Sequence, residues 1–148
     1  MHKEVIIFIL NDSKQILLQK RSANKKSHPN KWAVCSGHVE DFDDSFEAAA
    51  VRELDEELKI KATIEELEKL GEKEFVADDG STHITKYYCL INNDPEDSFI
   101  LQEEELSEVK WYDINIVIEM MEKKDDSIVF TDRMLEVLKE LKTANENR

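Results

Sequence analysis

The sequence predicts an α/β fold in which a mixed β-sheet is packed between helices. Three observations lead to this prediction. Apolar runs of strand length stand on both sides of one acidic segment with helical periodicity, turn-forming residues separate these runs, and two more segments with helical spacing close the chain. At 148 residues one hydrophobic core is the usual arrangement, so we expect a single domain over residues 1–148.

Six segments have the length and apolar composition of β-strands. They span residues 5–10, 15–20, 32–35, 72–76, 84–91 and 109–112. A turn at Asn11, Asp12 and Ser13 closes the first two strands into a hairpin, and residues 77–81 join the fourth and fifth strands into a second pair. We expect the polar segments 21–31 and 36–43 to be loops.

Three segments are expected to be helices. The first runs from about residue 45 to residue 58, and Asp44, with Glu47 three positions on, is expected to cap its first free amide groups. The other two, residues 114–123 and 132–142, carry apolar side chains at helical spacing. Residues 63–70 are expected to form a short helical turn.

The composition restricts the partners of the chain. With 34 acidic and 20 basic residues the net charge is −14, which argues against binding to a nucleic-acid polymer, because that binding depends on Lys and Arg. A phosphorylated small molecule remains compatible if a metal ion neutralises its charge. The apolar run 5–10 is too short for a membrane span or a signal peptide, and Cys35 and Cys89 form no CxxC pair. We expect a cytoplasmic protein with reduced thiols and no membrane contact, and a homodimer is compatible with the sequence.

Three glutamates of the first helix fall on one face. Glu53, Glu56 and Glu57 are three and four positions apart, so they lie side by side, while the opposite face is apolar. Like charges at this spacing repel by a few tenths of a kcal/mol per pair. A solvated acidic face is the ordinary explanation for such a helix. The order Arg-Glu-Leu-x-Glu-Glu after a glycine loop favours a Mg²⁺ site instead, since Mg²⁺ prefers carboxylate and water oxygens.

Residues 37–60 resemble the signature of the Nudix family, which is Gly, five residues, Glu, seven residues, then Arg-Glu-apolar-x-Glu-Glu-x-Gly-apolar. The matching residues are Gly37, Arg52, Glu53, Leu54, Glu56, Glu57 and Ile60. Three departures are visible. The loop has six residues, not five, before the acidic position, Asp44 replaces the first Glu, and Lys59 stands where the family has Gly. If Lys59 adopts the left-handed conformation common after a helix, it should cost roughly 1 kcal/mol.

The resemblance implies a Nudix α/β/α sandwich with a mixed central sheet. It also implies a Mg²⁺- or Mn²⁺-dependent hydrolase that cleaves a diphosphate linkage in a nucleoside diphosphate derivative or a nucleoside triphosphate. Glu53, Glu56 and Glu57 would coordinate one to three metal ions, with the Gly37 carbonyl as a further ligand, and Arg52 would orient Glu53 or pair with an acidic loop residue. The family commonly adds a late loop carboxylate as base or ligand. The candidates, which the sequence does not separate, are Glu103, Glu104, Glu105 and Glu108.

Residues 2–38 are similar to the Nudix subgroup related to isopentenyl diphosphate isomerase. Those isomerases use a cysteine directly before the glycine and a later Glu-x-Glu for proton chemistry. Here Ser36 precedes Gly37, and residues 82–88 lack Glu-x-Glu. Cys35 lies one position earlier, so its side chain is expected on the opposite face of the strand. We therefore interpret the chain as an isomerase-like hydrolase. An isomerase and a catalytically silent nucleotide-binding module are the alternatives.

Five further side chains are candidates for substrate contacts. Lys20 and Arg21 either bind a substrate phosphate or form an ordinary exposed strand end. His38, beside the signature glycine, either contacts substrate or metal or is structural. Trp32 and Phe42 have rings that could stack on a base, with Trp32 favoured as a core residue.

Overall fold

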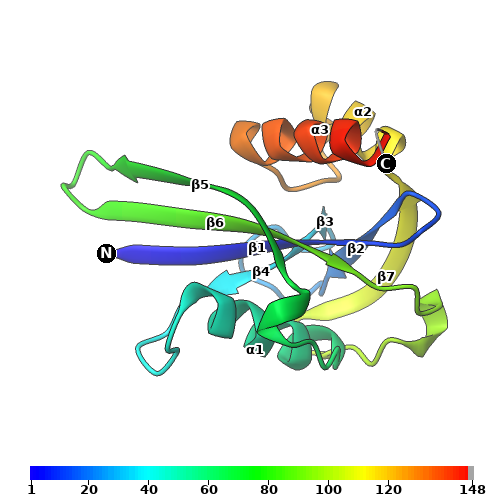
Figure 1. Ribbon diagram of the computed structural model, residues 1–148, viewed down its shortest axis with the longest axis horizontal. Helices are drawn as coiled ribbons and strands as arrows, with labels where there is room; N and C mark the ends of the chain where they lie inside the picture. Colours follow the sequence, from blue (N-terminus) through cyan, green and yellow to red (C-terminus); the bar gives the residue numbers. More distant parts are fainter. Residues whose placement is uncertain (147–148) are drawn as a thin grey trace.

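The computed structural model describes residues 1–146, and this part of the chain contains both strands and helices (Figure 1). Its strands are β1 (His2–Leu10), β2 (Gln15–Arg21), β3 (Trp32–Ala33), β4 (Cys35–His38), β5 (Glu68–Val76), β6 (Thr82–Ile91) and β7 (Leu106–Asp113). Its α-helices are α1 (Phe46–Leu58), α2 (Ile114–Glu122) and α3 (Asp132–Glu146), and its 3₁₀ helices are η1 (Ile64–Glu66) and η2 (Glu96–Ser98).

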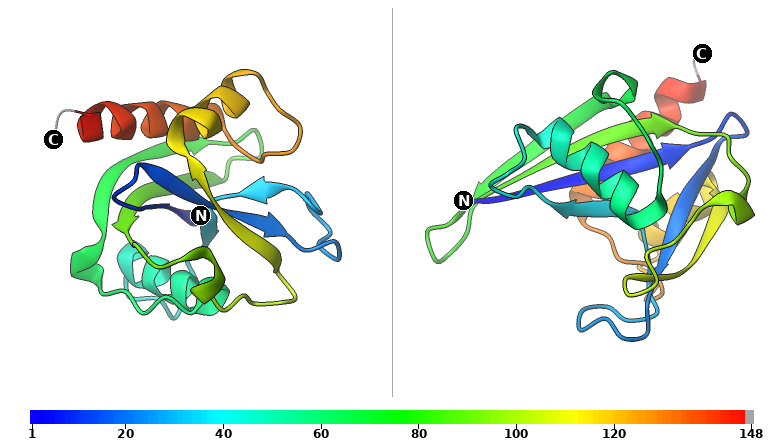
Figure 2. Two further views of the ribbon diagram at one scale, coloured as in Figure 1. Left: turned by 90° about the vertical axis from the view of Figure 1, so that its right-hand side faces the viewer. Right: turned by 90° about the horizontal axis from the view of Figure 1, so that it is seen from below.

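The strands form one mixed sheet with β1 at its centre. The order is β3-β2-β1-β6-β5, with β7 paired to β2 and β4 paired to β1. β1 runs parallel to β6 along its whole length and antiparallel to β4. β1 and β2 pair only at Leu10↔Ile16, so the expected hairpin opens directly after its turn, and β2 pairs instead with β7 and β3 (Figure 2).

Helices cover both faces of this sheet (Figure 1). α1 lies on one face, and α2 and α3 lie on the other. Successive side chains of a strand point to opposite faces, so β1 contributes to both layers of core. The α1 side receives Val5, Ile7 and Ile9, and the opposite side receives Ile6, Phe8 and Leu10. Burial on both faces explains the unbroken apolar run in the sequence and confirms the predicted α/β/α sandwich.

The N-terminus of α1 is capped by Ser45. Its hydroxyl oxygen accepts a hydrogen bond from the Ala48 amide at 3.0 Å, in the usual geometry of a serine cap. The prediction that Asp44 and Glu47 form this cap is wrong. The Glu47 carboxylate instead accepts a hydrogen bond from the phenolic hydroxyl of Tyr88 on β6 and so ties the first turn of α1 to the sheet.

Lys59 ends α1 in the left-handed conformation, with φ 57° and ψ 30°. Its amide donates to the Asp55 carbonyl at 3.0 Å, which is the hydrogen bond of an αL helix ending, and the Ile60 amide donates to the Leu54 carbonyl at 3.2 Å. The conformation expected for this departure from the family signature is therefore present.

Lys59→Gly is expected to raise the free energy of unfolding by roughly 0.5–1 kcal/mol, because glycine has no Cβ to clash in the left-handed region. Urea unfolding at equilibrium measures the change. Lys59→Ala is the control, since it removes the charge and keeps the Cβ, and it should give no gain. A gain of equal size in both variants would show that the charge, not the backbone conformation, was responsible.

Two segments expected as loop or turn are partly strand. β4 continues through His38, because Ser36 and Gly37 pair with Ile6 and Val5 of β1. The turn expected over residues 63–70 is reduced to η1, since β5 already begins at Glu68. Both differences come from pairing with strands distant in sequence, which local composition does not display.

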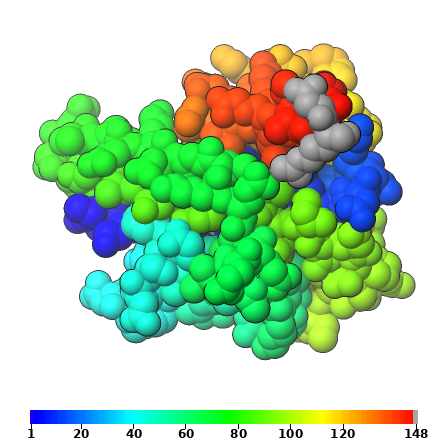
Figure 3. All heavy atoms as spheres, viewed as in Figure 1, coloured from blue at the N-terminus to red at the C-terminus, as the bar shows by residue number. Residues whose placement is uncertain are grey.

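The β5–β6 hairpin extends past the helices (green, left in Figure 3). Phe75 stacks on His83 with ring centroids 4.8 Å apart, and His83 stacks on His2 of β1 at 4.4 Å. In residues 1–146 the structure contains no helix both long and apolar enough to cross a membrane.

Candidate active site

A cavity of about 520 Å³ lies where β2, β4, α1 and two loops meet. It brings together segments that are far apart in sequence: the signature glycine and helix, the loop after β2, and the loop before β7. The signature residues that line it are Gly37, Glu53, Glu56 and Glu57. The three helix glutamates therefore face one common space, as their spacing predicts.

Arg52 binds three acidic side chains and one backbone carbonyl on this side of the cavity. Its Nε and Nη2 donate to the two carboxylate oxygens of Asp43 at 2.9 and 2.8 Å. Its Nη1 donates to Glu53 at 3.0 Å and to Glu56 at 3.1 Å, and Nη2 also donates to the His38 carbonyl at 3.0 Å. Arg52 therefore both orients Glu53 and pairs with a loop acid, the two roles that the family resemblance implies.

Asp43, and not Asp44, is the loop acid that pairs with the helix arginine. The Asp43 side chain is 4% exposed, and its Oδ2 also accepts from the Glu40 amide at 2.8 Å. The hydrogen bonds from Arg52 lower the pKa of this carboxyl. Five residues separate Gly37 from Asp43, as in the family signature, so the extra residue lies between Asp43 and Arg52. The prediction that Asp44 replaces the first signature Glu, with the extra residue between Gly37 and the acidic position, is therefore wrong.

Glu57 is the most enclosed of the three helix glutamates. Cys35 Sγ donates to its Oε2 at 3.2 Å, and Gln19 Nε2 donates to its Oε1 at 3.4 Å. Burial raises the pKa of Glu57 to about 8, against the lowering effect of these two hydrogen bonds. Burial also raises the pKa of Glu53. Both carboxylates are therefore held where ionisation is costly unless a cation is nearby.

Cys35 and Ser36 point to opposite faces of the sheet. Cys35 pairs with Ile7 and Ser36 with Ile6, and these two residues of β1 belong to different core layers. Cys35 is 1% exposed and lies beneath Glu57 on the α1 side, while Ser36 lines the cavity. Burial and the neighbouring Glu57 raise the pKa of the Cys35 thiol well above its ordinary value.

Gly37 leaves room for Glu53. A Cβ at position 37 would lie 2.2 Å from Glu53 Cδ, far closer than two carbon atoms can approach. β4 is fixed against β1 by its ladder, and α1 is fixed by its apolar face, so neither backbone can retreat easily. The absence of a side chain at this position is therefore a steric condition for the place that Glu53 occupies.

Basic side chains line the same cavity as the glutamates. Arg21 and Lys25, together with His28 and His38, face the cavity, and Arg21 Nε donates to the Ser27 carbonyl at 2.9 Å. Lys20 is not among the lining residues, because successive side chains of β2 point to opposite faces. The structure thus brings Arg21 and His38 to the site and leaves Lys20 outside it. Lys25 and His28 were not singled out as substrate contacts from the sequence.

Glu105 is the late glutamate that lines the cavity. Its carboxylate forms an ion pair with Lys25. The loop that carries it is docked on α1, since the Gln102 amide donates to the Glu57 carbonyl at 3.0 Å. This backbone contact determines that Glu105, among the candidate glutamates of the loop, reaches the cavity. The sequence alone does not distinguish these candidates.

The two rings considered for base stacking lie elsewhere. Trp32 packs edge-on against Tyr112 with ring centroids 5.5 Å apart and contributes to the core on the α2–α3 side. Phe42 is 71% exposed, and the Arg52 guanidinium lies 5.1 Å from its ring centroid. Neither ring lines the cavity.

The residues of the cavity fit a hard divalent cation bound with few protein ligands. Within residues 1–146, no group of three His, Cys, Asp or Glu side chains is close enough to hold a metal ion by itself. Mg²⁺ is usually bound through one or two carboxylates, with water and substrate phosphate completing its coordination. Glu53, Glu56 and Glu57 offer oxygen donors of this kind at one wall of the cavity.

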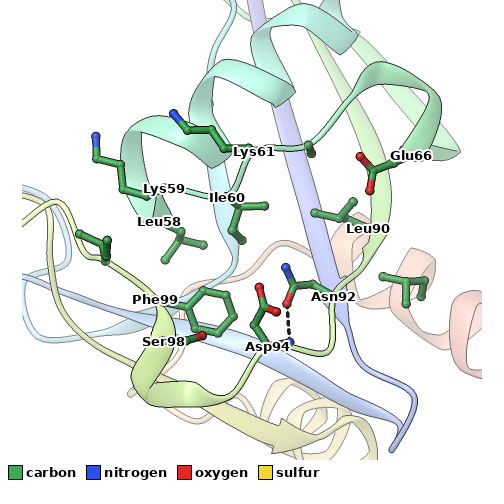
Figure 4. Close-up of a pocket in the computed structure, with 13 residues that line it drawn as sticks. Leu58, Lys59, Ile60, Lys61, Glu66, Leu90, Asn92, Asp94, Ser98 and Phe99 are labelled. Atoms are coloured by element: carbon green, nitrogen blue, oxygen red, sulfur yellow. Dashed lines mark hydrogen bonds between the residues drawn. The ribbon is translucent and has the colours of Figure 1, made fainter.

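A second, smaller cavity of about 200 Å³ lies at the C-terminal end of α1 (Figure 4). Leu58, Leu90 and Phe99 line it, and the side chains of Lys59 and Lys61 point away from it. The signature glutamates line the larger cavity instead, so we place the candidate active site there.

Comparisons with known proteins agree with this architecture. The NUDIX domain family matches residues 1–132. The chain belongs to the Nudix family. It is 35% identical over 138 residues to an isopentenyl-diphosphate Delta-isomerase of Aliivibrio fischeri (strain MJ11), covering 89% of this chain and 76% of that protein. It is 33% identical over 137 residues to Nudix hydrolase 3 of Arabidopsis thaliana, covering 86% of this Nudix chain but only 18% of that protein.

Solved structures show the same fold at low sequence identity. The MutT protein of Methanosarcina mazei Go1 superposes with a TM-score of 0.72 at 19% identity, covering 98% of this chain and 95% of that one. A C. elegans Ap4A hydrolase in a binary complex gives 0.67 at 22% identity, covering the whole of both chains. The Nudix assignment supports a hydrolase or a related enzyme of a family that generally uses a divalent metal.

Proposed function

We propose that this protein is a Mg²⁺- or Mn²⁺-dependent hydrolase of a diphosphate linkage, acting on a nucleoside diphosphate derivative or a nucleoside triphosphate. The observation that carries the proposal is the cavity that Glu53, Glu56 and Glu57 line together with Arg21 and Lys25. The carboxylate oxygens suit a divalent cation, and the basic residues in the same cavity suit phosphate oxygens.

Each side chain in the cavity has a proposed role. Glu53, Glu56 and Glu57 would hold the metal, with the Gly37 carbonyl as a further ligand. The bound metal would neutralise the charge of the diphosphate and lower the pKa of a water molecule. Arg52 holds Glu53 and Glu56 in place through its hydrogen bonds to both carboxylates. Arg21, Lys25 and His38 would bind the substrate.

Glu105 is proposed to accept a proton in the reaction. In the structure its carboxylate is neutralised by Lys25. A substrate phosphate offers Lys25 a second anionic partner, so binding of the substrate would release Glu105 to take up the proton of the attacking water. The role of base is one of the two, base or metal ligand, that the family resemblance implies for a late loop carboxylate.

The test is a substrate panel with Mg²⁺. Nucleotide sugars, dinucleotides, nucleoside triphosphates and ADP-ribose are incubated with the protein, and released phosphate esters are followed by ³¹P NMR. We expect Mg²⁺-dependent cleavage of the phosphoanhydride in at least one of these classes. Cleavage that continues in excess EDTA, or an inert protein across the panel, would contradict the proposal.

The isomerase is the second candidate, favoured by the relatives of that name and by the contact between Cys35 and Glu57. Isomerisation of an alkene needs a titratable acid that reaches the double bond. Cys35 is 1% exposed and does not line the cavity, and Ser36, the cavity-lining residue directly before Gly37, has no titratable thiol. Hydrolysis needs only a positioned diphosphate and metal-bound water, so we favour the hydrolase.

With isopentenyl diphosphate and Mg²⁺ in deuterated buffer, we expect neither a dimethylallyl product nor deuterium incorporation. The reason is that Cys35 is buried, and that the cavity is lined by Ser36, which carries a hydroxyl and not a thiol. Proton NMR of the recovered isoprenoid measures both outcomes. Metal-dependent conversion as fast as the best phosphohydrolase turnover would replace the hydrolase with the isomerase.

Two coarser proposals complete the assignment. A catalytically silent module is disfavoured, since a binding module has no need of a glutamate cluster in which burial raises the carboxyl pKa of both Glu53 and Glu57. We also propose a reducing, cytoplasmic environment, because Cys35 and Cys89 are both buried thiols.

A further inference from the structure

Gln19 occupies a position that the fold would ordinarily give to an apolar residue. It lies on β2, on the same side as Leu17, which belongs to the core beneath α1. Gln19 is only 3% exposed, although it reaches the inner end of the cavity. A leucine or methionine here would simply extend the core, so the amide requires another explanation.

The amide makes one hydrogen bond and leaves one atom without a partner. Its Nε2 donates to Glu57 Oε1 at 3.4 Å. Its Oε1 is the one buried side-chain oxygen or nitrogen that has no hydrogen-bond partner in residues 1–146. Reversing the amide would set its oxygen against a carboxylate oxygen of Glu57, so the orientation follows from the neighbour. A buried acceptor without a partner destabilises a fold and is rare in native proteins.

Glu57 is held from two sides. Gln19 contacts its Oε1 and Cys35 contacts its Oε2, so together they fix the plane of the carboxylate. The first contact comes from β2 and the second from β4, and both strands are anchored in the sheet. This arrangement therefore suits a ligand group that binds the Glu57 carboxylate and also donates a hydrogen bond to Gln19 Oε1.

We propose that Gln19 is a positioning residue of the metal site. It orients the Glu57 carboxylate for the cation and presents its carbonyl oxygen to a water that enters the cavity with the cation. This inference rests on the proposed function, because it presupposes a divalent ion at Glu57. The water donates a hydrogen bond to Gln19 Oε1, which satisfies the acceptor that lacks a partner in the metal-free protein. Groups that orient metal ligands in this way typically change metal affinity by about 10- to 100-fold.

The test replaces Gln19 by Met, which keeps the length of the side chain and removes the amide. Gln19→Leu is the second variant, should Met pack poorly. Gln15→Met is the matched control, because Gln15 lies on the same strand and same side but bonds Asn11 at 2.8 Å, away from the cavity. Isothermal titration of each protein with Mn²⁺ alone gives the dissociation constant, and the melting temperature of the metal-free protein is recorded in parallel.

We expect Gln19→Met to weaken Mn²⁺ binding by about 10- to 100-fold. Its metal-free melting temperature should be equal to or above that of the wild type, because the buried acceptor without a partner is gone. Gln15→Met should bind Mn²⁺ as the wild type does. A Gln19→Met protein with wild-type Mn²⁺ affinity overturns the inference, and a lowered melting temperature with unchanged affinity assigns Gln19 a structural role only. Wild-type protein that does not bind Mn²⁺ would overturn the proposed metal site itself, a result distinct from these two.

Discussion

Glu57→Gln is expected to lower turnover on the best substrate by at least about 100-fold while the protein stays folded. The variant keeps the size and polarity of the side chain and removes the negative charge that a cation requires. Because burial raises the pKa of Glu57 to about 8, removing the carboxylate should not lower the melting temperature of the metal-free protein. Steady-state kinetics at saturating Mg²⁺ and a thermal melt without metal measure the two effects.

Asp55→Asn is the matched control for this variant. Asp55 lies on the same helix, is paired with Lys61 and does not line the cavity, so the substitution removes one negative charge outside the site. Its turnover should equal that of the wild type. Near wild-type turnover by Glu57→Gln at saturating Mg²⁺ would show that the site is wrongly assigned.

Gly37→Ala is expected to reduce activity by about 100-fold, because displacement of a catalytic group by about 1 Å has an effect of this size. The new Cβ would meet Glu53 Cδ at 2.2 Å, so the carboxylate must leave the position in which Arg52 holds it. The whole effect is transmitted through one steric contact. Kinetics with Mg²⁺, together with the circular dichroism of the folded protein, separate this displacement from unfolding.

Gly71→Ala provides the control for the glycine substitution. A Cβ at Gly71 on β5 would meet only the guanidinium end of Arg133 at 3.3 Å, and this flexible side chain can move aside. Its activity should match that of the wild type. If Gly37→Ala is equally active, Glu53 is free to move without consequence, and its proposed role as a metal ligand is lost.

The sequence predicted those parts of the fold that local pattern determines. β1 and α1 were recognisable because burial on two faces or on one face leaves a continuous or a periodic apolar pattern. β4 and the start of β5 were missed, since they depend on pairing with β1 and β6. The cap at Ser45 was also missed, because Asp44 and Ser45 are both good capping residues and only the backbone conformation chooses between them.

The part of the candidate site that lies on the helix was predictable from residue spacing, whereas the part that lies on loops was not. Glu53, Glu56 and Glu57 share a face by helical geometry alone. Glu105 could not be distinguished from its acidic neighbours, because its placement depends on a hydrogen bond from Gln102 to the backbone of α1. Asp43 was missed because the chain between the glycine and the helix has one residue more than the family signature, and the sequence does not show where it lies.

The most direct test of the metal site is the change in melting temperature on adding Mg²⁺ or Mn²⁺, because it requires no knowledge of the substrate. At ten times the dissociation constant, binding contributes about 1.4 kcal/mol, which corresponds to a rise of roughly 3–6 °C for a chain of this size. Wild type and Asp55→Asn should show this rise, and Glu56→Gln should show much less. An equal rise in all three proteins would mean that the metal only screens the net charge of −14, and would contradict a cation site at the α1 glutamates.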